Sequence, residues 1–272
     1  MPRTTAGRSR QLGLLLKQWR RRRAVSQLAL ALEAGVSPRH LSFVETGRTR
    51  ASREFLLRLA DALRIPLRER NVLLAAGGFG PLYPQSDLAG EQLAPVRQAL
   101  ARLLEHQEPY PAVLLDRQWN VLQTNRAAPK LFSLFIDLQA LPPPPSRNLL
   151  RTMFDPQGMK PWIENWDDVA HTLVQRVFLE AVAGVPDERT LSLLGELRVR
   201  SPESYDAGLA VESPLPFHPV VFRKAELRLS FFSMVTTVGA PLDITAQELR
   251  IEAFFPADVV TEEFARRELA SR

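Results

Sequence analysis

The first part of the chain carries apolar residues at helical spacing. In the segment 10–23, Leu12, Leu16 and Trp19 fall on one face of a helix. The same period continues to residue 76 and is interrupted by capping serines, by glycine and by proline. This pattern predicts a run of short helices, at about residues 10–23, 26–35, 37–45, 52–63 and 66–76.

The periodicity breaks in residues 77–90, where Gly77, Gly78, Gly80 and Pro81 cluster. Such a cluster favours irregular structure, so we expect a linker there. It divides the chain into a domain at 10–76 and a second domain at 91–272.

The second domain mixes two periods. Apolar and polar residues alternate in Ala225–Phe231 and in Glu248–Phe255, which predicts strands with one buried face. Other segments have the helical period or short apolar runs; we expect helices at 91–106, 125–135 and between 147 and 199, and a strand pair at 112–123. The expected fold class is therefore multi-domain: an all-α, five-helix domain followed by an α+β domain with an antiparallel sheet.

Residues 27–45 have the constraints of a helix-turn-helix. Ala31 is small where two helices would cross, and Gly35 stands in the turn, where a positive φ is needed. The apolar positions at fixed offsets that would lock the two helices together are Leu30, Val36, Leu41 and Val44.

Charge supports this interpretation. The chain has 35 Lys and Arg against 30 Asp and Glu, but residues 1–70 hold 16 against 5. A basic domain attached to an acidic one indicates two parts with different partners, and the basic part suits nucleic acid.

Composition and motifs exclude several function classes. The chain has no cysteine, so a disulfide framework, a thiol nucleophile and a cysteine metal site are excluded. Its four histidines form no close ligand pair, and no nucleophile elbow, phosphate-binding loop or dinucleotide fingerprint is present. We expect no enzyme, no metal and no cofactor. Without a long apolar segment, we expect a cytoplasmic protein with no membrane partner.

The basic domain resembles the lambda-repressor-like, Xre-type helix-turn-helix family. The resemblance covers about residues 10–76 and rests on Ser26-Gln27, Gly35-Val36-Ser37, His40-Leu41-Ser42 and Glu45-x-Gly47-Arg48. Such modules place the second helix of the motif in the major groove of double-stranded DNA and read half-sites as dimers. The resemblance therefore implies a homodimer on DNA.

Candidate DNA contacts follow from that docking. At the start and on the outer face of the recognition helix, Ser37, Arg39, His40, Ser42 and Phe43 should face base edges. We expect phosphate contacts from Gln27, Arg48 and Arg50. Phe43 has an alternative role as a small-core residue. The run Arg20–Arg23 is less specific: it is either a set of direct DNA contacts or a solvated helix end near the DNA. Leu28 and Leu32 share an outer face; our hypothesis is that they dock on the second domain or on a partner chain, against the alternative of ordinary exposed leucines.

The second domain resembles the MmyB-like ligand-binding domain, which has a PAS-like fold. The resemblance covers about residues 92–256. It rests on ordered phrases, which begin at Pro111–Asn125 and continue through Asn148–Phe154, Trp166–Ala170, Pro186-Asp187, Ser201–Glu203 and His218–Val220. It implies a small hydrophobic effector, for which a fatty acid is the favoured identity.

We expect the effector to be held by polar anchors and apolar walls. A carboxylate needs a cation or a donor at one end; the candidate anchors are Arg151, Arg176 and His218, together with Trp119 and Asn125. The candidate walls are Phe132, Phe154, Phe178, Val182, Leu229 and Phe231, and for each the alternative is ordinary core. A haem ligand at His171 or His218 is a further alternative.

These expectations together predict a sequence-specific transcriptional regulator controlled by a hydrophobic effector. One alternative is a DNA-binding regulator whose second domain only dimerises or contacts RNA polymerase. Another is an enzyme targeted by its DNA-binding part, against which the absence of a catalytic constellation in the sequence counts.

Overall fold

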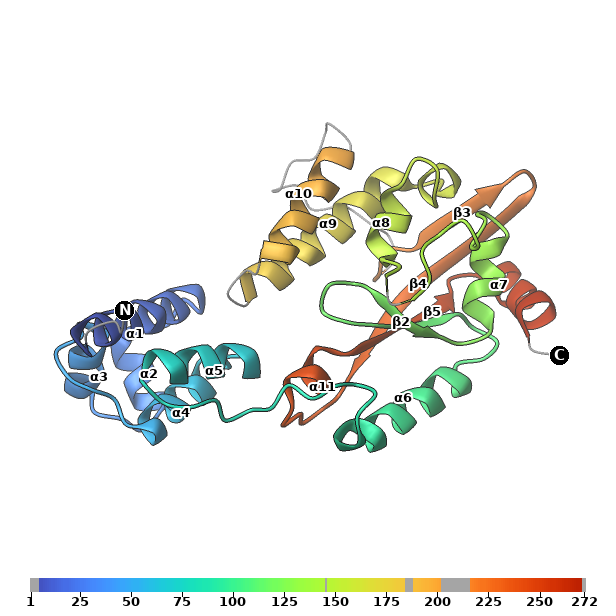
Figure 1. Ribbon diagram of the computed structural model, residues 1–272. Helices are drawn as coiled ribbons and strands as arrows, with labels where there is room; N and C mark the ends of the chain where they lie inside the picture. The colour runs from blue at the N-terminus through green and yellow to red at the C-terminus, as the bar shows by residue number, and fades with distance from the viewer. Residues whose placement is uncertain (1–4, 145, 184–187, 202–215, 271–272) are drawn as a thin grey trace. The chain divides into compact units, whose positions relative to one another are not determined.

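The computed structural model describes residues 5–144, 146–183, 188–201 and 216–270 (Figure 1). By its internal contacts the chain divides into two compact units, of which the first consists mainly of the chain up to Ser86 and also includes Leu242–Ile244. Each unit has its own hydrophobic core.

The first unit consists of helices in its described part, as the periodicity predicts. They are α1 (Thr5–Arg22), α2 (Gln27–Glu33), α3 (Pro38–Glu45), α4 (Arg53–Ala62) and α5 (Leu67–Ala76). The hydroxyls of Ser26, Ser37 and Ser52 accept hydrogen bonds from the first turns of α2, α3 and α4 and so fix where these helices begin. The predicted inward residues Leu30, Leu41 and Val44 are fully buried.

The second unit is α+β, which confirms the expected fold class. Its strands are β1 (Ala112–Leu115), β2 (Val121–Thr124), β3 (Val220–Lys224), β4 (Leu227–Thr237) and β5 (Arg250–Pro256). In the described residues they form a five-stranded sheet in the order β2-β1-β5-β4-β3, with each neighbouring pair antiparallel.

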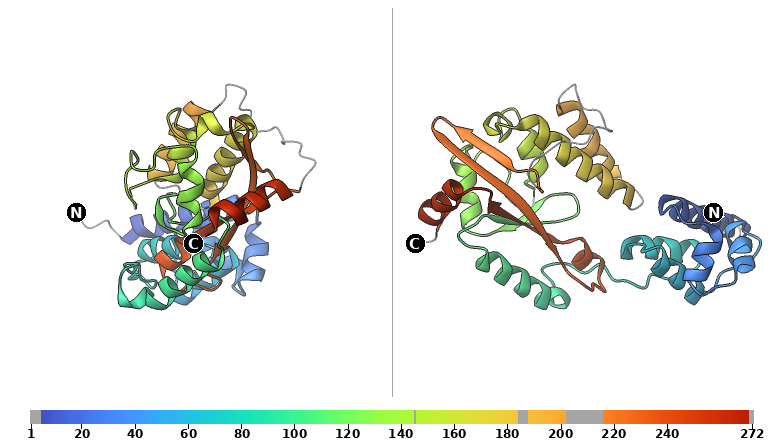
Figure 2. Two further views of the ribbon diagram at one scale, coloured as in Figure 1. Left: turned by 90° about the vertical axis from the view of Figure 1, so that its right-hand side faces the viewer. Right: turned by 180° about the vertical axis from the view of Figure 1, so that it is seen from behind.

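Helices cover both faces of this sheet (Figures 1 and 2). On one face α6 (Ala94–His106) packs on Leu114, Ile251 and Ala253. The larger core on the other face is closed by helices that are listed here with their bounds: α7 (Ala127–Ser133), α8 (Leu149–Phe154), α9 (Trp166–Ala183) and α10 (Glu188–Arg200). Short helical turns lie at Glu91–Leu93 and Lys160–Trp162, and the chain continues through α11 (Ile244–Glu248), α12 (Val259–Phe264) and a π-helical turn at Ala265–Leu269.

The two-sided cover corrects the strand predictions. The segment Glu248–Phe255 was expected to bury one face, yet residues 251–254 of β5 are all buried because α6 lies on one side and the main core on the other. The strand predicted at Ala225–Phe231 begins at Leu227, after a turn in which Ala225 has φ +50°. β3 and α12 were not predicted.

Candidate functional site

The helix-turn-helix has the local geometry that its sequence predicts. Gly35 adopts φ +62° in the turn between α2 and α3, a conformation that costs other residues about 1–2 kcal/mol. Ser37 caps α3 by accepting a hydrogen bond from the backbone N–H of His40 at 3.4 Å. Pro38 occupies the first helical position, so α3 is held from its first residue.

A buried carboxylate ties α3 to the helices before it. Glu45 is only 4% exposed. Its oxygens accept hydrogen bonds from Nε (2.8 Å) and Nη2 (3.0 Å) of Arg20, on α1, and from Nε2 of Gln27 (2.9 Å), on α2. The hydrogen bond to Glu45 raises the pKa of Arg20 above its usual value. Arg20 is therefore a structural residue and not part of a solvated helix end, the alternative considered for Arg20–Arg23.

The outer face of α3 carries most of the predicted base contacts. Arg39 and His40 are exposed, while Ser42 and Phe43 are half-buried. The guanidinium of Arg39 lies over the Phe43 ring, with 5.4 Å between Cζ and the ring centroid. His40 stacks on Phe55 of α4 at 4.5 Å, which fixes the orientation of its imidazole.

The predicted phosphate contacts surround this helix. Arg48 and Arg50 are exposed in the segment after α3. One N–H of the Gln27 side-chain amide donates to Glu45, and the amide has a second N–H donor, so its phosphate contact stays a prediction. Leu28 and Leu32 are 59% and 71% exposed, which fits a docking pair and ordinary exposed leucines alike, so their docking stays a hypothesis.

The second unit contains a cavity between the sheet and the helices α8 and α9. Its volume is about 90 Å³, and we call it the Trp119 cavity. Its apolar walls are Leu149, Leu150 and Met153 from α8, Val169 and Leu173 from α9, and Val220 and Phe254 from the sheet. Its polar lining consists of Trp119, Thr172, Arg176, His218, Ser233 and Glu252.

Ion pairs surround Trp119 at the polar side of this cavity. Arg176 contacts Glu252 (Nη1 to Oε1, 3.0 Å) and Glu180 (Nε to Oε1, 3.4 Å). Arg250 contacts Glu180 (Nη1 to Oε1, 2.8 Å), which also accepts a hydrogen bond from Nε1 of Trp119 at 3.1 Å. Both guanidinium groups lie close to the Trp119 ring, 4.5 Å away for Arg176 and 4.0 Å for Arg250.

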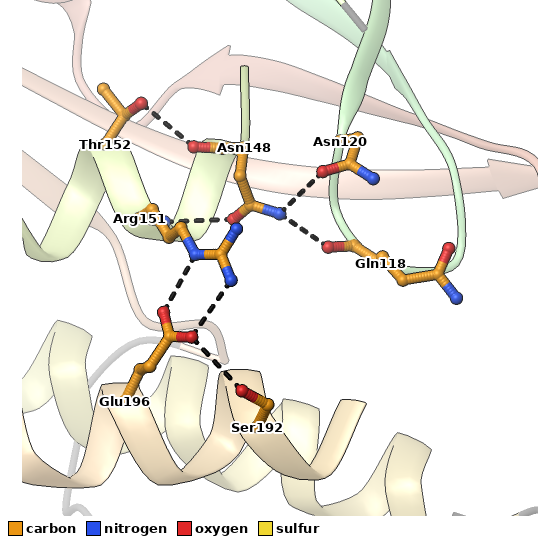
Figure 3. A network of polar contacts seen from close by, with 7 residues as sticks. All are labelled: Gln118, Asn120, Asn148, Arg151, Thr152, Ser192 and Glu196. Carbon is orange, nitrogen blue, oxygen red and sulfur yellow. Dashed lines mark hydrogen bonds and ion pairs between the residues drawn. The ribbon is translucent and has the colours of Figure 1, made fainter. Parts of the chain in front are cut away.

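Of the predicted anchors, Trp119, Arg176 and His218 line the cavity together. Arg151 does not, because its guanidinium binds Glu196 of α10 at the surface, with Nε–Oε2 2.9 Å and Nη2–Oε1 3.0 Å (Figure 3). This hydrogen bonding raises the pKa of Arg151 and lowers that of Glu196. Asn125 does not line it either, since its side-chain amide binds backbone groups at Tyr110, Ala112 and Ala128.

The predicted walls lie elsewhere in the unit. Phe154, Leu229 and Phe231 pack in the hydrophobic core, which was the alternative role considered for them. Phe178 is 39% exposed, and the guanidinium of Arg198 lies over its ring. Residues two apart on a helix point to nearly opposite sides, so Phe178 points outward because Arg176 faces inward. Phe132 lines a second space, of about 80 Å³, beside β1 and α7. The side chain of Val182 lies outside the described residues.

Sequence analysis missed several residues that line the cavity, above all Glu252. Its alternation with Ile251 and Ala253 indicated a solvent-facing position, and no local signal shows that the second face is also covered. Leu149, Leu150 and Met153 of α8 were also missed as walls. Asn148 holds α8 against the β1–β2 turn. Its Nδ2 donates to the carbonyl of Gln118 at 2.7 Å, and its Oδ1 caps the helix by accepting from the backbone N–H of Arg151 at 3.1 Å (Figure 3).

Two negative findings concern the described residues alone. Among them, no group of three or more potential His, Asp or Glu ligands could hold a metal ion. No helix in the same residues is long and apolar enough to cross a membrane.

Comparison with known proteins decides the family. Residues 96–267, more than half of the chain, match the family model of the MmyB-like transcription regulator ligand binding domain. The chain belongs to the MmyB-like transcription regulators. Residues 11–73 of this regulator match the model of a helix-turn-helix domain. The predicted helix-turn-helix domain and the MmyB-like domain are thereby confirmed, as is the expectation that the chain is not an enzyme.

Individual proteins add little to this assignment. No curated protein matches the MmyB-like regulator at a significant level. One matching solved structure is that of the clp gene regulator ClgR from Corynebacterium glutamicum, which is 27% identical. The match covers 38% of this chain and 95% of that one with a TM-score of 0.24, at which the likeness has no bearing on the fold.

Proposed function

We propose that a small, mainly apolar effector binds in the Trp119 cavity and controls the DNA binding of this transcription regulator. The family matches give the chain one domain for binding DNA and another for binding a ligand. The observation that carries the proposal is the cavity itself, because largely apolar walls with a few converging polar groups are typical of small-molecule sites.

A fatty acid is one particular kind of apolar effector, and the polar lining of the cavity bears on whether it fits. The expected fatty acid would place its carboxylate at Arg176 or His218, the cations or potential cations of the lining. Arg176 is already paired with Glu252 and Glu180, so a carboxylate would have to displace one of them. These ion pairs weigh against a fatty acid, and we propose the wider class of apolar effectors, with a fatty acid as one member to test.

On DNA, we propose that α3 enters the major groove. Its exposed Arg39 can donate two hydrogen bonds to one guanine, and Phe43 can pack on a thymine methyl group. His40 is held on Phe55 and can reach a base only from that position. Arg48, Arg50 and Gln27 contact phosphates, which makes the affinity strongly dependent on salt.

The regulator acts as a homodimer in this proposal, since one helix-turn-helix reads only a half-site. An effector that binds one arrangement of the dimer more tightly shifts the population toward it and so changes the operator affinity. An effector with equal affinity for both arrangements cannot regulate. The rival function is a regulator whose second domain only assembles chains or contacts RNA polymerase.

The test fills the cavity. Leu173→Trp places a large ring among the walls of α9, whereas Leu179→Trp, on the same helix, changes a residue that is 57% exposed and serves as the matched control. Organic extracts of the purified full chain are analysed by mass spectrometry. We expect a co-purifying apolar molecule with the wild type and Leu179→Trp but not with Leu173→Trp. Equal amounts from all three proteins, or none from any, would favour the rival.

A further inference from the structure

One buried carboxylate oxygen in the Trp119 cavity has no hydrogen-bond partner in the described residues. Glu252 lies on β5, opposite Val113 of β1 and Val235 of β4, and is 4% exposed. Its Oε1 accepts a hydrogen bond from Nη1 of Arg176 at 3.0 Å. Its Oε2 is buried and has no hydrogen-bond partner in the described residues. Leaving such an acceptor unpaired is unfavourable, so the structure has a site for a donor here.

The charges around this oxygen select the kind of donor. The cations Arg176 and Arg250 contact the anions Glu180 and Glu252, so the four charges balance, while Nε and Nη2 of Arg250 are also buried without a hydrogen-bond partner in the described residues. A ligand carboxylate would add a negative charge beside Glu252 and compete with it for Arg176, at a high desolvation cost. A hydroxyl or an amine adds no negative charge and brings the missing hydrogen atom.

The other polar residues of the lining do not replace such a donor. Thr172, His218 and Ser233 line the same cavity, but within the described chain none of them donates a hydrogen bond to Oε2 of Glu252. Phe254, two residues along β5, faces the same cavity. Apolar walls therefore stand directly beside the free acceptor.

We propose that the effector is an apolar molecule whose head group donates an O–H or N–H hydrogen bond to Oε2 of Glu252. The body of the molecule packs on the apolar residues of α8 and α9. This inference rests on the proposed function, since it names the head group of the ligand in that same cavity.

Four ligands that share one tail test the head group on the full chain: dodecan-1-ol, dodecylamine, dodecanoate and methyl dodecanoate. By isothermal titration calorimetry, the alcohol or the amine binds about tenfold or more tightly than the methyl ester, which has no donor. Dodecanoate binds more weakly than the better donor. Preference for the alcohol identifies a neutral donor, and preference for the amine identifies a cation. An ester that binds as tightly as both donors, or dodecanoate as the tightest ligand, would overturn the proposal.

A variant reverses the polarity of the site. Glu252→Gln keeps an acceptor for Arg176 and turns an amide N–H₂ toward the cavity. The advantage of the donors over the ester should fall about tenfold or invert. Glu226→Gln, at an exposed glutamate in the turn between β3 and β4, is the matched control and should leave the order unchanged. An unchanged order in a folded Glu252→Gln protein contradicts the assignment; where this variant does not fold, the ligand order of the wild type decides.

The design separates the two levels of the proposal. If all four ligands fail to bind the wild type, the apolar-effector function and the head-group assignment both fail. If they bind, are lost in Leu173→Trp and show no preference for a donor, the effector function stands and the assignment to Glu252 is wrong.

Discussion

The buried contact between Arg20 and Glu45 allows a quantitative prediction about the DNA-binding domain. The side chain of Glu45 is 0% exposed and that of Arg20 is 16% exposed. Glu45→Ala removes three hydrogen bonds to the carboxylate and leaves the guanidinium without its anion. Removing one partner of a buried pair costs about 3–5 kcal/mol. Arg20 can turn partly toward water, so we expect about 3 kcal/mol.

Peptide-level hydrogen exchange of the full chain measures this loss. A cost of about 3 kcal/mol corresponds to exchange roughly 100-fold faster in peptides from α1 and α3. Peptides from β1 and β5 belong to the other unit and are the internal control. The double variant Arg20→Met with Glu45→Met removes both charges and should lose much less stability than Glu45→Ala. If exchange in α1 and α3 is unchanged by Glu45→Ala, the contact does not hold the recognition helix.

Three further variants test other parts of the structure. Arg39→Ala should cost about 1–3 kcal/mol of discrimination between bases, whereas Arg48→Ala should weaken binding to all sequences and reduce the salt slope by about one; fluorescence anisotropy on duplexes obtained by in vitro selection checks both. Gly35→Ala should cost about 1–2 kcal/mol in urea unfolding, because φ is +62° and nothing lies within 4 Å to clash; no change would mean that the turn adapts. Glu196→Gln should lower stability by up to about 1 kcal/mol at pH 7. Since Arg151 lowers the pKa of Glu196, its contribution is present above the usual value of 4.5 and is lost as the pH falls through the lowered pKa, so thermal melts of the two proteins should converge in acid.

Local signals account for what could be predicted in the DNA-binding domain. A capping serine, a proline at the first helical position and a glycine at positive φ each act within a few residues, so Ser37, Pro38 and Gly35 were placed correctly. The partner of Arg20 could not be found in this way, since Glu45 lies 25 residues away in the sequence.

The ligand cavity depends on packing between distant elements, and the sequence located only part of it. The need of a carboxylate for a cation or a hydrogen-bond donor indicated Trp119, Arg176 and His218, which the structure brings together. The sequence could not show that Arg151 is bound by α10, or that a second layer of helix covers β5 and buries Glu252. Helical geometry alone would have separated Arg176 from Phe178, because the two side chains cannot face the same cavity.

The central claim is that the effector in the Trp119 cavity controls DNA binding. The most direct measurement is the affinity of the full chain for a duplex obtained by in vitro selection, with and without a saturating amount of the tightest of the four dodecyl ligands. We predict a change of about tenfold or more, which a coupling free energy of about 1.4 kcal/mol produces. Leu173→Trp should abolish the change and Leu179→Trp should keep it. Identical affinities with and without a ligand that demonstrably occupies the cavity would contradict the account.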